Sequence, residues 1–287
     1  MELFSLIAAS LTLNAPGFSQ EQLGVSYFEW LTNSIVASVI VVGVILLWAR
    51  KATRTMQVVP GSTQNTFEAV VEFLYDMLEG IVGKHMVSRV FSLLASLFIF
   101  ILIANWFGLL PGVGSIGWGH EVPGHGFEVA VPILRPTTAD LNMTLGMATV
   151  FMGFWLYWTV TEVGVWGFVV HTFGPKGGLK GFMALIFAFI FFFVGLIEVI
   201  SILIRPVSLS LRLFGNVYAG ETLLSSMITL GNTLGLPHIV TYIISLIVPI
   251  PFYFLELLIG LLQALVFMLL CAVYIQLSTS HDVEEEH

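Results

Sequence analysis

This chain of 287 residues has the composition of a membrane protein rather than that of a water-soluble one. Hydrophobic residues make up 57% of it and charged residues only 10%, whereas soluble domains carry roughly 25% charged residues. The net charge of -8 argues against a nucleic-acid partner, and the single cysteine, Cys271, excludes an internal disulfide.

Long uncharged runs predict several membrane-spanning helices. The runs at 31–49, 90–119, 141–161 and 181–197 approach or exceed the ~20 residues that a helix needs to cross the hydrocarbon layer. They are too long and too uniformly apolar for the alternating ten-residue strands of a β-barrel. We therefore expect an all-α fold, a polytopic membrane helix bundle that forms a single membrane domain over 1–287.

Basic residues gather near one set of span ends, as they do in cytoplasmic loops. These residues are Arg50, Lys51, Arg54, Lys84, Arg89, Lys176 and Lys180. We therefore expect the N-terminal segment 1–30 and the loop 111–140 outside, and the acidic tail 281–287 in the cytoplasm. Because no basic residue precedes its short apolar stretch, we expect the N-terminal segment to stay on the mature protein.

Between the first two spans, residues 65–82 predict an amphipathic helix at the membrane surface. Asn65 and Glu68 have the spacing of an N-cap and its capping-box acid. Acidic residues then recur on one helical face and apolar residues on the other. The acids are Glu68, Glu72, Asp76 and Glu79. This acidic face is either solvated or contacts a basic protein.

The stretch 181–280 predicts two helices that are too long for upright crossings. Residues 182–230 and 238–277 would extend roughly 70 and 60 Å, about twice the thickness of the hydrocarbon layer. We therefore expect a strongly tilted hairpin that turns at 231–237. Pro249 and Pro251 are the expected kink sites in its second arm.

Five ionisable residues lie in this hairpin at positions where hydrocarbon would surround them. They are Glu198, Arg205, Arg212, Glu221 and Glu256. Each such charge costs roughly 2.5 to 3.5 kcal/mol at membrane depth, so it is rarely kept without a function or a partner.

The spacing of these residues suggests a polar stripe on each arm of the hairpin. Glu198, Arg205 and Arg212 recur every seven residues, with Ser208 and Asn216 nearby, and Glu256 and Gln263 do so on the return arm. Two facing stripes predict a membrane-buried ion path. The alternative is that Arg212 only neutralises a carboxylate of its own chain.

Several motifs together resemble subunit a of the F-type ATP synthases. The run 205–221, RPVSLSLRLFGNVYAGE, is similar to the long arginine motif of that family, and 263–267, QALVF, to its second motif. The segments 105–111, NWFGLLP, and 136–144, PTTADLNMT, match the family in order and spacing. The resemblance covers most of the chain from about residue 65 onward.

The resemblance implies a stator subunit whose tilted hairpin lies against a rotating ring of c subunits. By position, Arg212 matches the ring-facing arginine of the family. The positions associated with two aqueous half-channels are matched by Glu198, Asn216, Glu221, Glu256 and Gln263, and Ser208 lies between the two arginines. The family often pairs an acid with a histidine at 221 and 256, whereas both positions are Glu here.

The resemblance also implies the setting in which the chain works. We expect a multi-pass protein of a bacterial inner membrane that carries protons or sodium ions during ATP synthesis. Its implied partners are the c ring, b-type stalk subunits and the remaining synthase subunits, with no cofactor.

A secondary ion-coupled transporter is the alternative function, since such proteins also keep buried ionisable residues. Transporters usually show two related halves with broken helices at matching places, and we find no internal repeat. A purely structural scaffold does not account for five buried charges. Because no phosphate loop, nucleophile triad or metal-ligand spacing is present, we expect no enzymatic activity of the chain by itself.

Overall fold

The structure, a computed structural model, describes residues 32–54, 56–110, 113, 116–122, 126–173 and 182–279. Its elements in chain order are α3 (Asn33–Thr53), α4 (Ser62–Gly108), β1 (Gly117–Val122), β2 (Gly126–Pro132), the 3-10 helix η2 (Thr137–Ala139), α5 (Leu141–Phe173), α6 (Phe182–Thr233), α7 (His238–Ile247) and α8 (Pro249–Thr279). Within this described part, five helices are long and apolar enough to cross a membrane, and α7 and α8 together count as one of them. The expected all-α, multi-pass bundle is confirmed.

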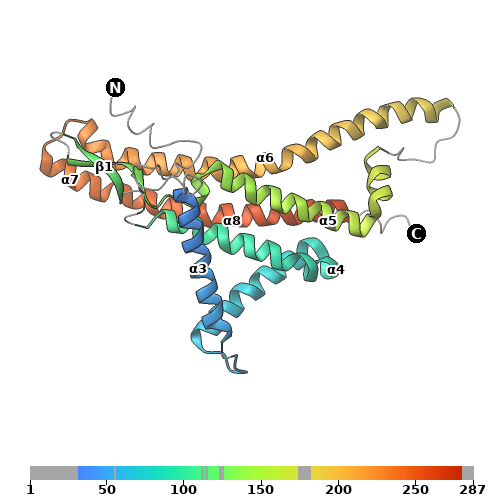
Figure 1. Ribbon diagram of the computed structural model, residues 1–287, viewed down its shortest axis with the longest axis horizontal. Coiled ribbons are helices and arrows are strands. Elements are labelled where there is room, and N and C mark those ends of the chain that lie inside the picture. The colour runs from blue at the N-terminus through green and yellow to red at the C-terminus, as the bar shows by residue number, and fades with distance from the viewer. Residues whose placement is uncertain are drawn as a thin grey trace, which may run out of the picture.

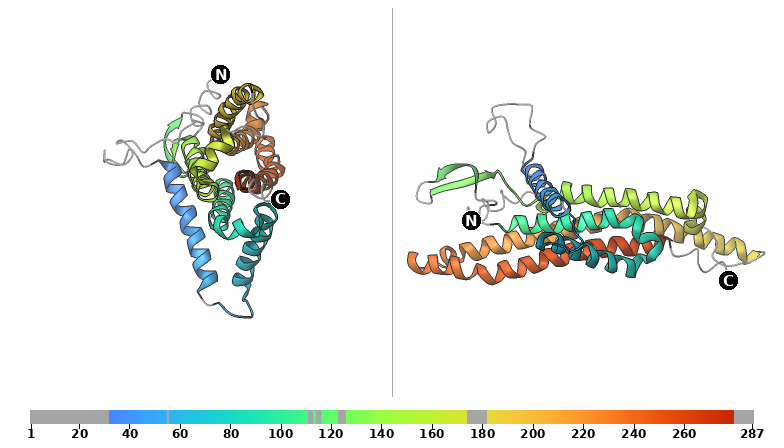
Figure 2. Two further views of the ribbon diagram at one scale, coloured as in Figure 1. Left: turned by 90° about the vertical axis from the view of Figure 1, so that its right-hand side faces the viewer. Right: turned by 90° about the horizontal axis from the view of Figure 1, so that it is seen from below.

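The long helices lie side by side along the longest axis of the molecule. In Figures 1 and 2, α5, α6, α8 and the second half of α4 run along this axis, and α4 packs on α8 while α5 packs on α6. Helix α3 stands across the stack (Figure 1). If α3 crosses the bilayer upright, α6 and α8 are strongly tilted, as their length predicted.

The hydrophobic core lies between α4, α5, α6 and α8. Buried side chains at its centre come from each of these helices, and they include Leu94, Phe151, Leu213 and Met268. Many other apolar side chains face outward, which is the arrangement expected where lipid or another membrane protein surrounds the bundle.

Helix α4 begins one turn before its predicted start. Its N-cap is Gly61, so the prediction that Asn65 caps the helix is wrong. The Gln64 side chain bonds to the backbone of Gln57 and donates to the Glu68 carboxylate over 2.8 Å. Glu68 therefore accepts from a side chain inside the helix, which a capping box would not require.

The first half of α4 is amphipathic, as the sequence predicts. Leu74 and Leu78 are buried, while the acids before Glu79 are exposed. The Glu79 carboxylate forms an ion pair with the Lys84 ammonium group, with 3.8 Å between Oε1 and Nζ. At Gly83 the backbone leaves the helical region with φ +78° and ψ 164°, a conformation that glycine adopts without a Cβ clash. The helix bends there, between its amphipathic first half and its apolar second half.

The uncharged run at 90–119 is helical over most of its length, and the helix ends just before the predicted loop 111–140. Helix α4 ends at Gly108, where an added Cβ would stand 2.8 Å from the Pro136 ring. Beyond it, β1 and β2 form an antiparallel pair, which the sequence did not predict. The strand pair lies within the predicted loop 111–140 and includes Glu121 and Glu128, so the uncharged run reaches only the first residues of β1.

The C-terminal hairpin turns and bends where it was predicted to. After α6 the backbone reverses at Gly235, with φ +65°, and the Leu236 amide bonds to the Gly231 carbonyl, as in a glycine-terminated helix. The return arm breaks between α7 and α8 at Val248, directly before Pro249. The proline lacks the amide hydrogen needed to continue the helix.

Candidate functional site

Arg212 lies on the outer face of α6. Its side chain is exposed and makes no ion pair with any described residue, whereas Leu209 and Leu213 on the inner face are buried. An arginine in a helix apolar enough to span a membrane, with no carboxylate of the described residues paired to it, disfavours the alternative in which it merely neutralises an internal acid.

Small and apolar side chains surround Arg212 on this outer face. Ser208, Leu211, Gly215 and Ala219 are exposed, and their spacing places them on one side of the helix. Small residues on a membrane helix allow another helix to approach closely. The face is therefore open to contact with a second membrane protein.

The polar residues of the two arms meet one turn beyond Arg212. The Asn216 amide donates to the Gln263 side-chain oxygen over 2.6 Å and joins α6 to α8. Gln263 is only 4% exposed, and its own amide nitrogen finds no partner among the described residues. The stripes inferred from the sequence thus come together at this pair.

Glu256 lies against Gly220 in the same contact between α6 and α8. An added Cβ at Gly220 would collide with both carboxylate oxygens of Glu256, so the two helices come this close only because residue 220 has no side chain. Glu221 follows directly on α6, and one oxygen of its carboxylate is buried without a hydrogen-bond partner in the described part of the chain.

Arg135 is a charged neighbour of this cluster that sequence reasoning did not assign to the site. It lies between β2 and η2, is only 2% exposed, and its charge acts on Glu221. The available signal was its position as the sole base in the loop 111–140.

Asn105 and Thr138 extend the polar contacts away from α6. The Thr138 hydroxyl donates to the Asn105 side-chain oxygen over 2.7 Å, and the Asn105 amide donates to the Gly260 carbonyl over 3.2 Å. Both residues lie in motifs singled out in the sequence, which gave them no role. They link α4, the segment before α5, and α8 next to Gln263.

Glu198 is not part of this cluster. It is half-buried on α6, about four turns before Arg212, whereas Glu221 lies about two and a half turns after it. The structure therefore places the acidic residues on both sides of the arginine along the helix axis and does not gather them at one point.

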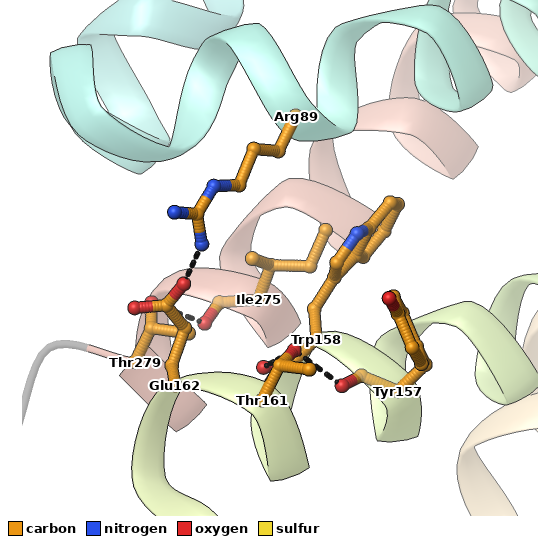
Figure 3. A network of polar contacts seen from close by, with 7 residues as sticks. All are labelled: Arg89, Tyr157, Trp158, Thr161, Glu162, Ile275 and Thr279. Atoms are coloured by element: carbon orange, nitrogen blue, oxygen red, sulfur yellow. Dashed lines mark hydrogen bonds and ion pairs between the residues drawn. The ribbon is translucent and has the colours of Figure 1, made fainter.

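Glu162, on α5, takes part in a separate network shown in Figure 3. It pairs with Arg89 of α4, and Thr161 next to it bonds back to the Tyr157 and Trp158 carbonyls of its own helix. This network ties α4 to α5 near the end of α8 and includes none of the predicted path residues.

Metal binding has no support in the residues that the structure describes, where no group of three or more potential ligands occurs. The structure does not describe the side chains of His120, Glu121, Glu128 and His238, or any part of His125.

These features define a class of protein: a multi-pass membrane protein with a polar site between two long helices and an unpaired arginine beside it. Comparison with known families gives the particular one. The family model described as "ATP synthase A chain" matches residues 31–276. The chain belongs to this family, subunit a of the F-type ATP synthases.

Curated relatives named "ATP synthase subunit a" agree over nearly the whole length. The chain is 32% identical to that of Citrifermentans bemidjiense over 273 residues, covering 94% of this chain and 93% of the relative. It is 33% identical to that of Trichlorobacter lovleyi over 259 residues, covering 89% of each, and 30% identical to that of Aliarcobacter butzleri over 257 residues, covering 90% and 92%. The chain is thus a membrane-sector subunit of ATP synthase, with a part in ion transport and ATP synthesis.

Proposed function

We propose that this chain is the stator subunit whose Arg212 faces a rotating ring of c subunits and couples ion flow to rotation. The observation that carries the proposal is the exposed Arg212 guanidinium on α6, which has no acidic partner among the described residues of its own chain. A charge at membrane depth needs a partner, and here that partner belongs to another subunit.

A ring carboxylate is the partner whose chemistry fits. It crosses lipid in its neutral form and gives up its ion where it meets a fixed positive charge. At ~4 Å and an effective dielectric near 20, that attraction is about 4 kcal/mol, enough to favour the ionised carboxylate strongly. Arginine stays protonated at any working pH, so Arg212 attracts the acid without relaying a proton itself.

The acids on the two sides of Arg212 supply two separate half-channels in this proposal. Glu198 and Ser208 lie on one side of Arg212 along α6, and Asn216 and Glu221 on the other. Glu256 and Gln263 of α8 join the second group through their contacts with α6. Arg212 between the groups repels cations, so ions cross only by riding on the ring.

The proposal also covers the orientation of the chain in the membrane and its partner subunits. The whole chain acts as a single membrane domain in which residues 181–280 supply the ion path. The N-terminus lies outside and the C-terminus in the cytoplasm of a bacterium, with b-type stalk subunits holding the chain still against the ring. Each charge gains about 2.3 kcal/mol per 100 mV, and nucleotide chemistry takes place on other subunits.

The direct test replaces Arg212 with alanine in the assembled complex in inverted membrane vesicles. We expect Arg212→Ala to abolish ATP-driven ion pumping and ATP synthesis, while ATP hydrolysis by the detached catalytic head is unchanged. The control is Arg54→Ala, which removes an exposed arginine directly after α3 and should pump normally. Pumping by Arg212→Ala at the control rate would refute the proposal.

The identity of the ion is tested in the same vesicles. We expect ATP-driven acidification of the vesicle interior that needs no sodium and collapses when a protonophore is added. Sodium-dependent pumping that resists the protonophore would assign sodium as the ion and leave the role of Arg212 intact.

A further inference from the structure

Arg205, the other arginine of α6, lies between two aromatic rings of neighbouring helices. Its guanidinium carbon is 4.8 Å from the centre of the Tyr274 ring on α8 and 5.6 Å from that of the Trp155 ring on α5. Both distances are within the ~6 Å at which a cation is attracted to an aromatic face. Arg205 is half-buried and Trp155 only 3% exposed, so water competes weakly for this contact.

The two helices that carry these rings are joined by hydrogen bonds. The Trp155 indole N–H donates to the Tyr274 carbonyl over 2.9 Å, and one turn further along each helix the Thr159 hydroxyl bonds to that of Ser278 over 3.0 Å. We call Trp155 and Tyr274, on the joined helices α5 and α8, the aromatic clamp. A guanidinium held there fixes α6 to both helices.

The clamp contacts α6 next to a proline inside the helix. Pro206 follows Arg205 inside this 52-residue helix, and a proline there removes one backbone hydrogen bond and pushes against the preceding turn. Arg212 lies about two turns further on. Between them, the Ser210 and Thr144 hydroxyls, 3.0 Å apart, make a second attachment of α6 to α5.

We propose that Arg205 is a positioning residue: held by the clamp at Pro206, it keeps α6 from yielding when the rotor pulls on Arg212. The inference rests on the proposed function, in which a ring carboxylate is drawn to Arg212 and then driven past it. That event loads α6 sideways and along its axis. A helix that gives way at the proline lets the carboxylate slip past without a completed ion transfer.

The alternative role for Arg205 is purely electrostatic, as a positive charge near the ion path. The two roles are separated by changing the clamp while keeping the charge. Tyr274→Phe retains the aromatic face, whereas Tyr274→Leu removes it, and neither alters the backbone carbonyl that bonds to Trp155. Arg205→Met removes the charge from the same clamp.

The experiment measures ions pumped per ATP hydrolysed by the whole complex in vesicles, with and without an opposing membrane potential. Values are normalised to assembled complex. We expect Tyr274→Leu and Arg205→Met to match wild type without load and to fall at least twofold under load, and Tyr274→Phe to match wild type throughout. The double variant Arg205→Met/Tyr274→Leu should be no worse than the poorer single variant, because both remove one contact.

Tyr157→Leu, an aromatic-to-leucine change at an exposed position of α5, should match wild type under load. Normal pumping by Tyr274→Leu under load overturns the inference. If Arg205→Met loses pumping under load while Tyr274→Leu does not, the role of Arg205 is electrostatic. Arg212→Ala in the same vesicles separates the two proposals, since its failure to stop pumping refutes the proposed function itself.

Discussion

Individual residues determine how closely the two arms of the hairpin approach. Gly220 gives the clearest case, because its missing side chain makes room for the Glu256 carboxylate of α8. The nearby bond from Asn216 to Gln263 needs the same approach. The distance between α6 and α8 at the polar cluster therefore depends on one glycine.

Gly220→Ala should slow ion pumping several-fold. The added methyl group would collide with the Glu256 carboxylate, and overpacking of this kind costs about 1–3 kcal/mol. The initial rate of ATP-driven pumping measures the effect. Gly153→Ala, at a glycine with open space around it, is the matched control. Adding Glu256→Asp to Gly220→Ala draws the carboxylate back and should restore part of the rate. Equal rates for the two glycine variants would show that the contact between Gly220 and Glu256 does not affect pumping.

Glu256→Gln should also slow translocation, for a chemical reason. The amide keeps the size of the side chain and its place beside Gly220 but cannot ionise, so it cannot take up and release the transported proton. Pumping rates across a range of pH provide the measurement. A variant that equals wild type at every pH would remove Glu256 from the path.

At the scale of elements, two glycines with positive φ set the course of the helices. Gly83 bends α4 between its amphipathic and its apolar half, and Gly164 bends α5 with φ +77°. These bends bring Arg89, just after the first, near Glu162, just before the second, where the two side chains pair.

Gly83→Ala should destabilise the protein by roughly 1–3 kcal/mol, because φ +78° with ψ 164° is a backbone conformation that is essentially restricted to glycine. Gly80→Ala is the control, since Gly80 lies in regular helix with open space around it and alanine favours the helix there. Thermal unfolding of the purified complex compares the two variants. A midpoint lowered equally in both would mean that Gly83 does not require its positive φ.

Local signals predicted some elements well and missed others. The hairpin turn and the break before Pro249 follow from glycine and proline, whose backbone preferences act at the residue itself. The strand pair β1–β2 was missed because it lies in the segment 111–140, which was predicted only as a loop. The Asn65 cap was predicted wrongly because Gly61 offers an earlier start and Glu68 is bound by Gln64.

The site shows the same division between local and long-range information. The sequence motifs single out Arg212 and Gln263, and helix periodicity predicts a polar stripe on each arm, of which the structure brings Asn216 and Gln263 together. It does not predict that the Arg205 side chain packs on Trp155 and Tyr274. Nor does it place Arg135 beside Glu221. Both contacts join segments that are far apart in the chain, and no local pattern reports them.

At the scale of the whole molecule, the core supports one face of α6 and leaves the opposite face exposed. Its buried residues lie between α4, α5, α6 and α8, and α6 turns Leu209 and Leu213 into this core. The opposite face of α6 carries Arg212 among small and apolar residues. A fixed support behind an outward-facing charge is the arrangement that a stator needs if a rotor passes in front of it.

Cysteine cross-linking in the assembled complex tests this central claim most directly. Single cysteines at exposed positions 208 and 211 of α6, and at buried positions 209 and 213, are each paired with a cysteine next to the carboxylate on the ring helix. The native Cys271 is buried and serves as an unreactive background. We predict disulfides from 208 and 211 but none from 209 and 213. Equal cross-linking from both sets, or none from 208 and 211, would contradict a ring-facing Arg212.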